Sequence, residues 1–172
     1  MRRARENEGG AAAPGTVVVV MPLPALPPLI YPDNSVLSRL SDPSVALAAE
    51  AAMVRRIVEA CRSHRLRLLS SVVLEAEVGN GPLFVQRESR NVLTLAETSV
   101  PLSEILRAVR RLNRLRLPAT DALHIAAAAA GGARYAVSCD NDWLERAGQL
   151  AAVLGAWPMI VTPAQLVERE GL

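Results

Sequence analysis

Short apolar runs alternate with helical stretches along most of this chain, and that alternation constrains its fold more than any other feature. Strands are predicted over residues 29–33, 66–71, 91–96, 134–138 and 158–162. Consecutive strands joined through helices form right-handed crossovers, which make the strands parallel and put helices on both faces of the sheet. We therefore predict an α/β fold, a three-layer α/β/α sandwich with a central parallel sheet of four to five strands.

Helices are expected between and after these strands. They are predicted over 34–40, 43–63, 72–78, 83–91, 101–117 and 118–132, within 139–150, and over 163–170. The predicted core face of the 101–117 helix consists of Leu102, Ile105, Leu106, Val109 and Leu112. Its other side is interpreted as a solvated face, or alternatively as a contact for phosphates or an acidic partner, and consists of Arg107, Arg110, Arg111 and Arg114.

One domain is predicted over residues 28–172, because the chain is long enough for a single core and too short for two. Residues 1–27, charged at first and then rich in Gly, Ala and Pro, are predicted to be a flexible tail. A start at Met21 would make most of that tail an artefact of gene calling. No signal peptide or membrane span is predicted for 16–30, because glutamates precede it and four prolines would break its helix. We therefore expect a cytoplasmic protein with no membrane contact.

The composition excludes several functions. All 19 basic residues are arginines, so phosphate loops, Schiff-base enzymes and kinases, which need a lysine, are excluded. Aromatic residues make up 3% of the chain, too few for a platform that stacks single-stranded bases. Cys61 and Cys139 lie far apart in sequence and are predicted to be buried thiols, because neither a zinc site nor a disulfide framework has this spacing.

Carboxylates follow the predicted strands at the place where parallel sheets form their active sites. Asp33 ends the first strand, Asp140 follows the fourth, and Asp121 lies in the first turn of the 118–132 helix. Because the carboxyl ends of parallel strands share one edge, we expect these acids to approach one another. Like charges at such a short separation need a cation to neutralise them, and oxygen donors favour Mg²⁺ or Mn²⁺. Such an ion activates water for attack on a phosphodiester.

Each of these acids also has a purely structural interpretation. Asp33, and one of Asp140 and Asp142, fit the caps of the helices that follow them. Asp121 fits a first-turn acid that complements the helix dipole. The structural interpretation holds for each acid alone and weakens if all of them converge.

Three further residues lie close to these acids in the predicted fold. Glu75 and Glu77 point to different sides of their helix, so at most one of them faces the site. His124 lies three residues after Asp121 and shares its helix face. We expect a packed or hydrogen-bonded histidine there, with metal ligation as the alternative.

Four stretches resemble PIN-domain nucleases of the VapC-like toxin type, over about residues 29–168. The most specific is LPATDALHIAAAAAGGARYAVSCDNDWL, in which an acid opens an Ala-rich helix that is followed by Gly, a strand, and a small polar residue with an acid. IYPDNSVLSRL, SSVVLEAEV and MIVTPAQLV resemble the family's opening strand, the segment of its second acid, and its closing strand and helix. Pro32 departs from the pattern, since many members have a small aliphatic residue or Leu before the first acid.

The resemblance implies a site and a chemistry. The implied acidic quartet, both catalytic and able to bind Mg²⁺ or Mn²⁺, consists of Asp33, Glu77, Asp121 and Asp140. Asp142 is implied as an auxiliary metal ligand, and the nearby Glu75 leaves the choice of the second acid open. Ser35 and Ser138 match small polar residues that orient the acids or a bound water. The resemblance also implies endoribonuclease activity, a homodimer, and a small antitoxin protein that inhibits the enzyme.

We therefore expect a metal-dependent endoribonuclease that hydrolyses RNA phosphodiester bonds and is the toxin of a type II toxin–antitoxin pair. The alternative is a catalytically inactive PIN-like module for binding or scaffolding. An aspartyl-phosphate phosphotransferase is disfavoured, because the first acid stands in DNS and the chain has no lysine. A dinucleotide-binding protein is disfavoured as well, because the Gly pair at 131–132 ends a helix instead of following a strand.

Overall fold

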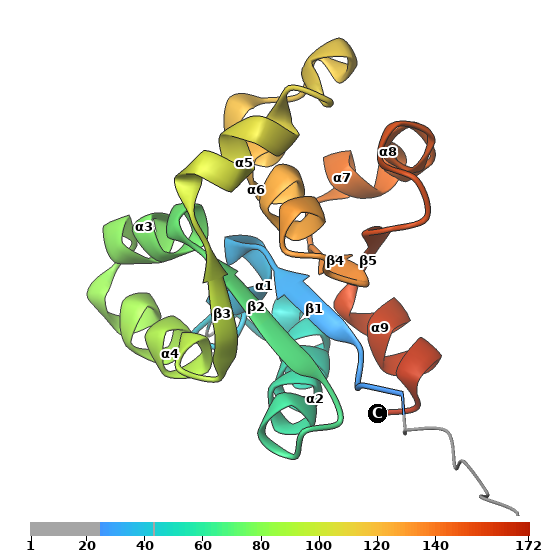
Figure 1. Cartoon of the computed structure of the whole chain (residues 1–172). Helices are drawn as coiled ribbons and strands as arrows, with labels where there is room; N and C mark the ends of the chain where they lie inside the picture. The colour runs from blue at the N-terminus through green and yellow to red at the C-terminus, as the bar shows by residue number, and fades with distance from the viewer. Residues whose placement is uncertain (1–24, 43) are drawn as a thin grey trace, which may run out of the picture.

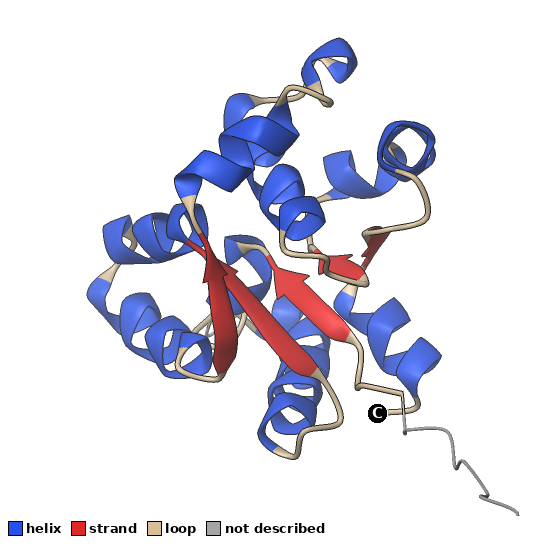
Figure 2. Ribbon diagram, viewed as in Figure 1, coloured by secondary structure: helices blue, strands red, loops and turns tan. Residues whose placement is uncertain are grey.

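A single sheet of five parallel strands forms the centre of the protein (Figures 1 and 2). The computed structural model describes residues 25–42 and 44–172, so residues 1–24 of the predicted tail lie outside it. The strands are β1 (Leu29–Pro32), β2 (Arg67–Ser71), β3 (Ala96–Val100), β4 (Tyr135–Val137) and β5 (Met159–Val161). They lie in the order β3-β2-β1-β4-β5, and each neighbouring pair is parallel. The predicted α/β class and parallel sheet are confirmed.

The helices cover both faces of this sheet. They are α1 (Asn34–Ser38), α2 (Ala48–Arg62), α3 (Val72–Asn80), α4 (Leu83–Leu93), α5 (Leu102–Val109), α6 (Ala119–Ala130), α7 (Asn141–Glu145), α8 (Ala147–Leu154) and α9 (Pro163–Glu170), with 3-10 turns η1 (Val45–Leu47) and η2 (Asn113–Leu115). Right-handed crossovers put α1 to α4 on one face, where α9 packs against α2, and α5 to α8 on the other (Figure 1). This arrangement is the predicted three-layer sandwich. Among residues 25–42 and 44–172, no helix is long and apolar enough to cross a membrane.

The strand order places a topological switch point between β1 and β4. The chain extends the sheet from β1 through β2 to β3, and then returns to add β4 on the other side of β1. Loops diverge at the carboxyl ends of two such strands and leave an opening where ligands bind in folds of this kind. Asp33 follows β1 directly, and its backbone N–H donates to the carbonyl of Val137 at the end of β4 over 3.0 Å. The first predicted acid therefore lies at the switch point.

The prediction of a strand over 91–96 is wrong in position. Asn91–Leu93 end α4, in which Val92 is buried, and the strand β3 begins only at Ala96. β3 is an edge strand whose middle residues, Glu97 to Ser99, are exposed. An exposed edge strand lacks the apolar run that marks a buried one, so the apolar residues of the preceding helix gave the stronger signal.

The predicted 101–117 helix is shorter than expected and only partly buried. α5 ends at Val109, and after η2 the chain turns at Arg116, whose φ of 49° is left-handed. Ile105 and Leu112 are buried as predicted, whereas Leu102 and Leu106 are about half exposed. In Figure 1, α5 extends past the carboxyl ends of the strands, so it packs on α6 along one side and is uncovered along the other. The predicted 43–63 helix is likewise divided, into η1 and α2, and Pro43 lies outside the described residues.

Small residues bring α6 close to the sheet. Ile125 and the alanines 126–128 are fully buried. A Cβ atom on Gly131, the residue after the helix, would lie 2.3 Å from Cδ2 of Leu69 and 2.8 Å from Cγ2 of Val100. Only glycine fits so close an approach between the helix end and strands β2 and β3. The approach packs the carboxyl end of α6, the helix that carries Asp121 and His124, closely against the sheet.

Candidate functional site

Asp33 is the most buried acid of the site, with 6% of its surface exposed. It caps α1: Oδ1 accepts from the Val36 N–H at 3.0 Å and from the Ser35 hydroxyl at 2.5 Å, while Oδ2 accepts from the Ser138 hydroxyl at 2.5 Å. Burial raises the pKa of Asp33, and these three donors lower it part of the way back. A carboxylate offers about four lone-pair sites. The remaining site, on Oδ2, can therefore serve a cation.

The two predicted serines tie the ends of β1 and β4 together. Besides donating to Asp33, the hydroxyl of Ser35 accepts from the Cys139 N–H at 3.0 Å, and that of Ser138 accepts from the Asp140 N–H at 2.9 Å. Asp140 in turn caps α7, because its Oδ1 accepts from the Asp142 N–H at 2.8 Å. Of the two acids considered as caps, Asp140 is therefore the cap. It is also exposed, which leaves its other carboxylate oxygen accessible.

Asp121 stands in the first turn of α6, facing the start of α7. Burial raises the pKa of Asp121 most, and the negative charges of Asp140 and Asp142 raise it further. Hydrogen bonding with the side chain of Trp143, a buried residue of α7, lowers the pKa in part. The effect of Asp140 and Asp142 on Asp121 shows that three of the predicted acids share one electrostatic environment.

Glu77 reaches the site through a buried chain of hydrogen bonds. Its Oε2 lies 2.8 Å from Nε2 of His124, and Nδ1 of His124 lies 2.7 Å from the hydroxyl of Tyr31. The Tyr31 hydroxyl lies 2.9 Å from that of Ser71, which also accepts from the Leu74 N–H. Every member is satisfied if Ser71 donates to Tyr31, Tyr31 to His124, and a neutral His124 to Glu77. His124 is thus buried and hydrogen-bonded, as predicted, and it holds Glu77 in place.

Glu75 and Glu77 lie on different sides of α3, as predicted. Oε1 of Glu75 accepts from the hydroxyls of Ser70 and Ser99, at 2.9 and 2.7 Å, beside strands β2 and β3. Glu77 instead contacts α6, the helix that carries Asp121. Of the two glutamates, Glu77 is therefore the one that contacts the helix carrying Asp121.

The donor set fits a hard cation that is bound largely through water. Within the described part of the chain, no three Asp, Glu, His or Cys side chains lie close enough together to hold a metal ion by themselves. The expected close approach of three acids is therefore not found there. Mg²⁺ commonly keeps several waters and takes one or two carboxylates together with substrate phosphates. Asp121 and Asp140, with the free lone pair of Asp33 nearby, match that requirement.

Both cysteines are free, as predicted, and neither is suited to nucleophilic chemistry. Burial raises the pKa of Cys61 to about 12 and that of Cys139 to about 11, so both thiols are protonated at neutral pH. Cys61 is buried, whereas Cys139 is only partly so and lines an apolar cavity of about 340 Å³ next to Asp140. The acids are therefore the candidate reactive groups of this edge.

Sequence reasoning missed three members of the site, Tyr31, Ser71 and Trp143. A usable signal existed for two of them, because Tyr31 and Ser71 stand at the carboxyl ends of neighbouring parallel strands, and such residues meet at one edge. Trp143 gave only the signal of a buried helical residue. No protein-family model and no curated protein matches this chain. The functional argument therefore rests on the residues and their geometry.

Proposed function

We propose that this protein is a PIN-like endoribonuclease that hydrolyses RNA phosphodiester bonds with the help of Mg²⁺ or Mn²⁺. One observation carries the proposal: Asp33 and Asp140 follow adjacent strands at the switch point of the parallel sheet, and the negative charge of Asp140 raises the pKa of Asp121 in the first turn of α6. In the part of the chain that the structure covers, no salt bridge includes any of the three. Acids without a salt-bridge partner, two of which, Asp33 and Asp121, have raised pKa values, are typical of sites that bind a cation for catalysis.

In the proposed hydrolysis, the acids of the site have separate roles in binding the cation and accepting a proton. Asp121 and Asp140 would hold the cation, with Asp33 as a third donor oriented by Ser35 and Ser138. The cation, when bound, supplies charge that polarises the phosphate and makes water easier to deprotonate. Glu77, oriented by His124, would accept a proton from the attacking water. Asp142 adds negative charge next to Asp121 and Asp140 as an auxiliary ligand.

The biological setting that the sequence resemblance supports is that of a type II toxin. In this proposal the protein acts in the cytoplasm as a homodimer and is inhibited by a small antitoxin protein. A short reading frame directly upstream, whose product restores growth when this protein is expressed, would support this setting. Growth that is indifferent to expression of the active protein would contradict it.

RNA cleavage by the purified protein tests the proposal. With Mn²⁺, the protein should cleave a single-stranded RNA, and EDTA should stop the reaction. A metal site supplies several kcal/mol of transition-state stabilisation, so Asp33→Asn and Asp121→Asn should each lower the rate by about 10³-fold or more. Glu75→Gln is the matched control, because Glu75 is bonded to Ser70 and Ser99 on the other side of α3. Cleavage that survives both Asp changes would overturn the assignment.

A second candidate is a catalytically inactive PIN-like module for binding or scaffolding. It is favoured by the finding that no three potential ligands converge among the described residues. It predicts no Mn²⁺ binding by calorimetry at millimolar concentration and no cleavage under any metal. Mn²⁺ binding that Asp121→Asn removes would exclude it.

A further inference from the structure

Positive charge is concentrated in one segment beside the candidate site. The segment, here called the arginine arm, comprises residues 102–117, which form α5, the turn after it, and η2. Its five arginines are Arg107, Arg110, Arg111, Arg114 and Arg116. It contains one acid, Glu104, so it carries more positive charge than the whole chain, whose formal net charge is +2. The rest of the protein is therefore net acidic.

The guanidinium groups of the arm are not paired with acids. All five arginines are exposed, and none of them takes part in a salt bridge among residues 25–42 and 44–172. Arg111 donates to the carbonyl of Val153 at 3.2 Å and keeps further N–H groups free. Elsewhere in the protein, Arg39 pairs with Glu50 and Arg67 with Glu97. Solvated arginines whose charge no acid balances are available to an anionic ligand.

The arm is held firmly against the elements that carry the acids. Ile105 and Leu112 are buried and anchor it to the core. The guanidinium of Arg146 donates to the carbonyl of Leu115 at 3.2 Å, and Arg146 directly follows α7, the helix that Asp140 caps. The arm also leads directly into α6, whose first turn carries Asp121. The carboxyl-terminal end of the arm is thus held beside the elements that carry Asp121 and Asp140.

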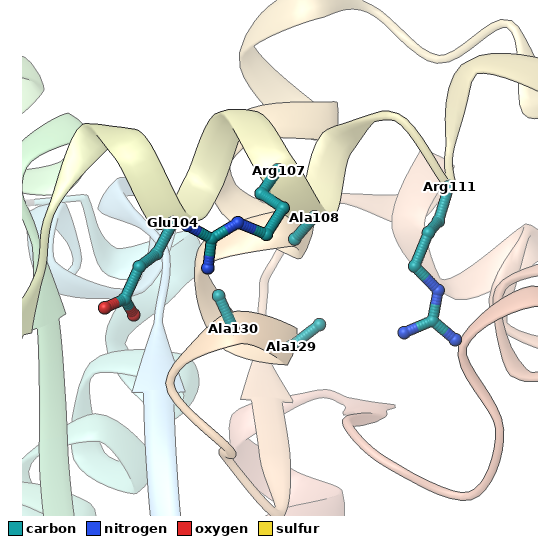
Figure 3. Close-up of a pocket in the computed structure, with 6 residues that line it drawn as sticks. All are labelled: Glu104, Arg107, Ala108, Arg111, Ala129 and Ala130. Atoms are coloured by element: carbon teal, nitrogen blue, oxygen red, sulfur yellow. The ribbon is translucent and has the colours of Figure 1, made fainter.

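A concave surface on the arm shows how phosphate could fit. Arg107 of α5 and Arg111, in the turn after it, line this surface together with Glu104, Ala129 and Ala130 (Figure 3). The small alanine side chains leave a cavity of about 270 Å³ between the helices. Planar guanidinium groups with parallel N–H donors match phosphate oxygens, to which they bind in a bidentate manner.

We propose that the arginine arm binds the phosphate backbone of single-stranded RNA and delivers it to the acidic edge. The choice of RNA rests on the proposed function. Recognition through the backbone agrees with the scarcity of aromatic residues, because stacking on bases would need several of them exposed. An acidic protein is the competing ligand. The negative charges of Asp121, Asp140 and Asp142 would repel its carboxylates, whereas the phosphates of RNA would contact the cation bound there.

RNA binding measured without cleavage tests this inference. The anisotropy of a fluorescein-labelled single-stranded 20-mer is followed in EDTA at several salt concentrations, for the wild type and for R110Q/R114Q. Each phosphate contact on a single strand contributes about 0.7 to the slope of log K against log salt, so the double variant should lower the slope by about 1.4. The affinity at 100 mM salt should fall roughly 10-fold.

Two matched variants separate this effect from a general loss of charge. R87Q/R90Q removes the same charge from exposed positions of α4, and it should leave the slope and the affinity unchanged. R110K/R114K keeps the charge and should retain most of the slope. Equal losses in R110Q/R114Q and R87Q/R90Q, or a loss in neither, would overturn the inference, as would wild-type protein that does not bind RNA.

The outcomes also separate the arm from the catalytic proposal. RNA binding that depends on the arm, without any cleavage in Mn²⁺, would support the RNA-binding role of the arm and refute the proposed nuclease activity. Cleavage that depends on Asp121, with binding indifferent to Arg110 and Arg114, would refute the arm alone. If polyglutamate competes as well as RNA and with the same dependence on these arginines, the arm is a surface for acidic proteins and the inference fails.

Discussion

The edge of the sheet where the strands begin and the edge where they end differ in how their charged groups are paired. At the edge where the strands begin, Arg67 of β2 pairs with Glu97 of β3 over 2.6 Å, and the pKa of Glu97 is lowered by Arg67. At the same edge, the hydroxyl of Tyr135 donates to Glu170 at 2.5 Å. Acids there have partners that suit their charge. The chain's C-terminus lies close to this edge (Figure 1).

At the edge where the strands end, the acids lack such partners. Burial is the main cause that raises the pKa values of Asp33 and Asp121, and no arginine of the described ranges forms a salt bridge with either. Proteins tolerate charges of this kind mainly where function requires them, because a buried charge without a partner costs stability. The comparison therefore separates an edge whose acids have partners from an edge whose acids, in the proposed function, bind a cation.

Replacement of Asp33 gives the largest expected change in stability. Asn keeps the acceptor for Val36, is as good a helix cap as Asp, and removes a buried negative charge. Asp33→Asn should therefore raise the free energy of unfolding of the metal-free protein at pH 7 by about 0.5–2 kcal/mol while it abolishes cleavage. Urea unfolding in EDTA measures this. A less stable Asn variant would mean that the site is not under electrostatic strain.

The difference in the free energy of unfolding between Asp33→Asn and wild type should depend on pH. The pKa of Asp33 is raised in the folded state, so its contribution to stability is complete below the unfolded pKa, about 3.9, and is lost as the pH rises through the folded pKa. The stability advantage of Asp33→Asn over wild type should thus be least near pH 4 and grow with pH until the folded pKa has been passed. Unfolding curves between pH 4 and 8 measure it. An advantage that shrinks with rising pH would contradict the raised pKa.

The smallest change is expected at the opposite edge. The Arg67–Glu97 pair is solvent-accessible, so its attraction is screened by water and salt. Glu97→Gln should lower the free energy of unfolding by about 0.2–1 kcal/mol at low salt, with a smaller loss in 1 M NaCl, and should leave RNA cleavage unchanged. A loss of cleavage in this variant would contradict the claim that cleavage depends only on the edge where the strands end.

The fold was largely predictable, because periodicity reports burial. Strands β1, β2, β4 and β5 consist largely of buried residues, and each was predicted within one or two residues. β3 and α5 were misplaced or misjudged because neither is buried on both sides. Leu102 and Leu106 have the spacing of a core face, yet α5 extends beyond the sheet and leaves them about half exposed. Periodicity cannot tell which part of an amphipathic helix its neighbours will cover.

The candidate site was predictable in part. The rule that strand ends converge brought Asp33, Ser138 and Asp140 together correctly, because it depends only on the order of elements. The distance between carboxylates depends on side-chain rotamers and on hydrogen bonds such as those of Asp33 with Ser35 and Ser138, which no spacing in the sequence encodes. The link from Glu77 through His124 to Tyr31 joins three elements far apart in the chain. Only the packed structure shows it.

The location of a bound Mn²⁺ ion tests the account most directly. Paramagnetic Mn²⁺, added in small amounts to ¹⁵N-labelled protein, broadens the amide signals of residues near its binding site. We predict broadening that begins around Asp33, Asp121 and Asp140 and disappears in Asp121→Asn. Broadening that centres on Glu97 and Glu170 at the opposite edge, or that is the same in wild type and Asp121→Asn, would contradict the account.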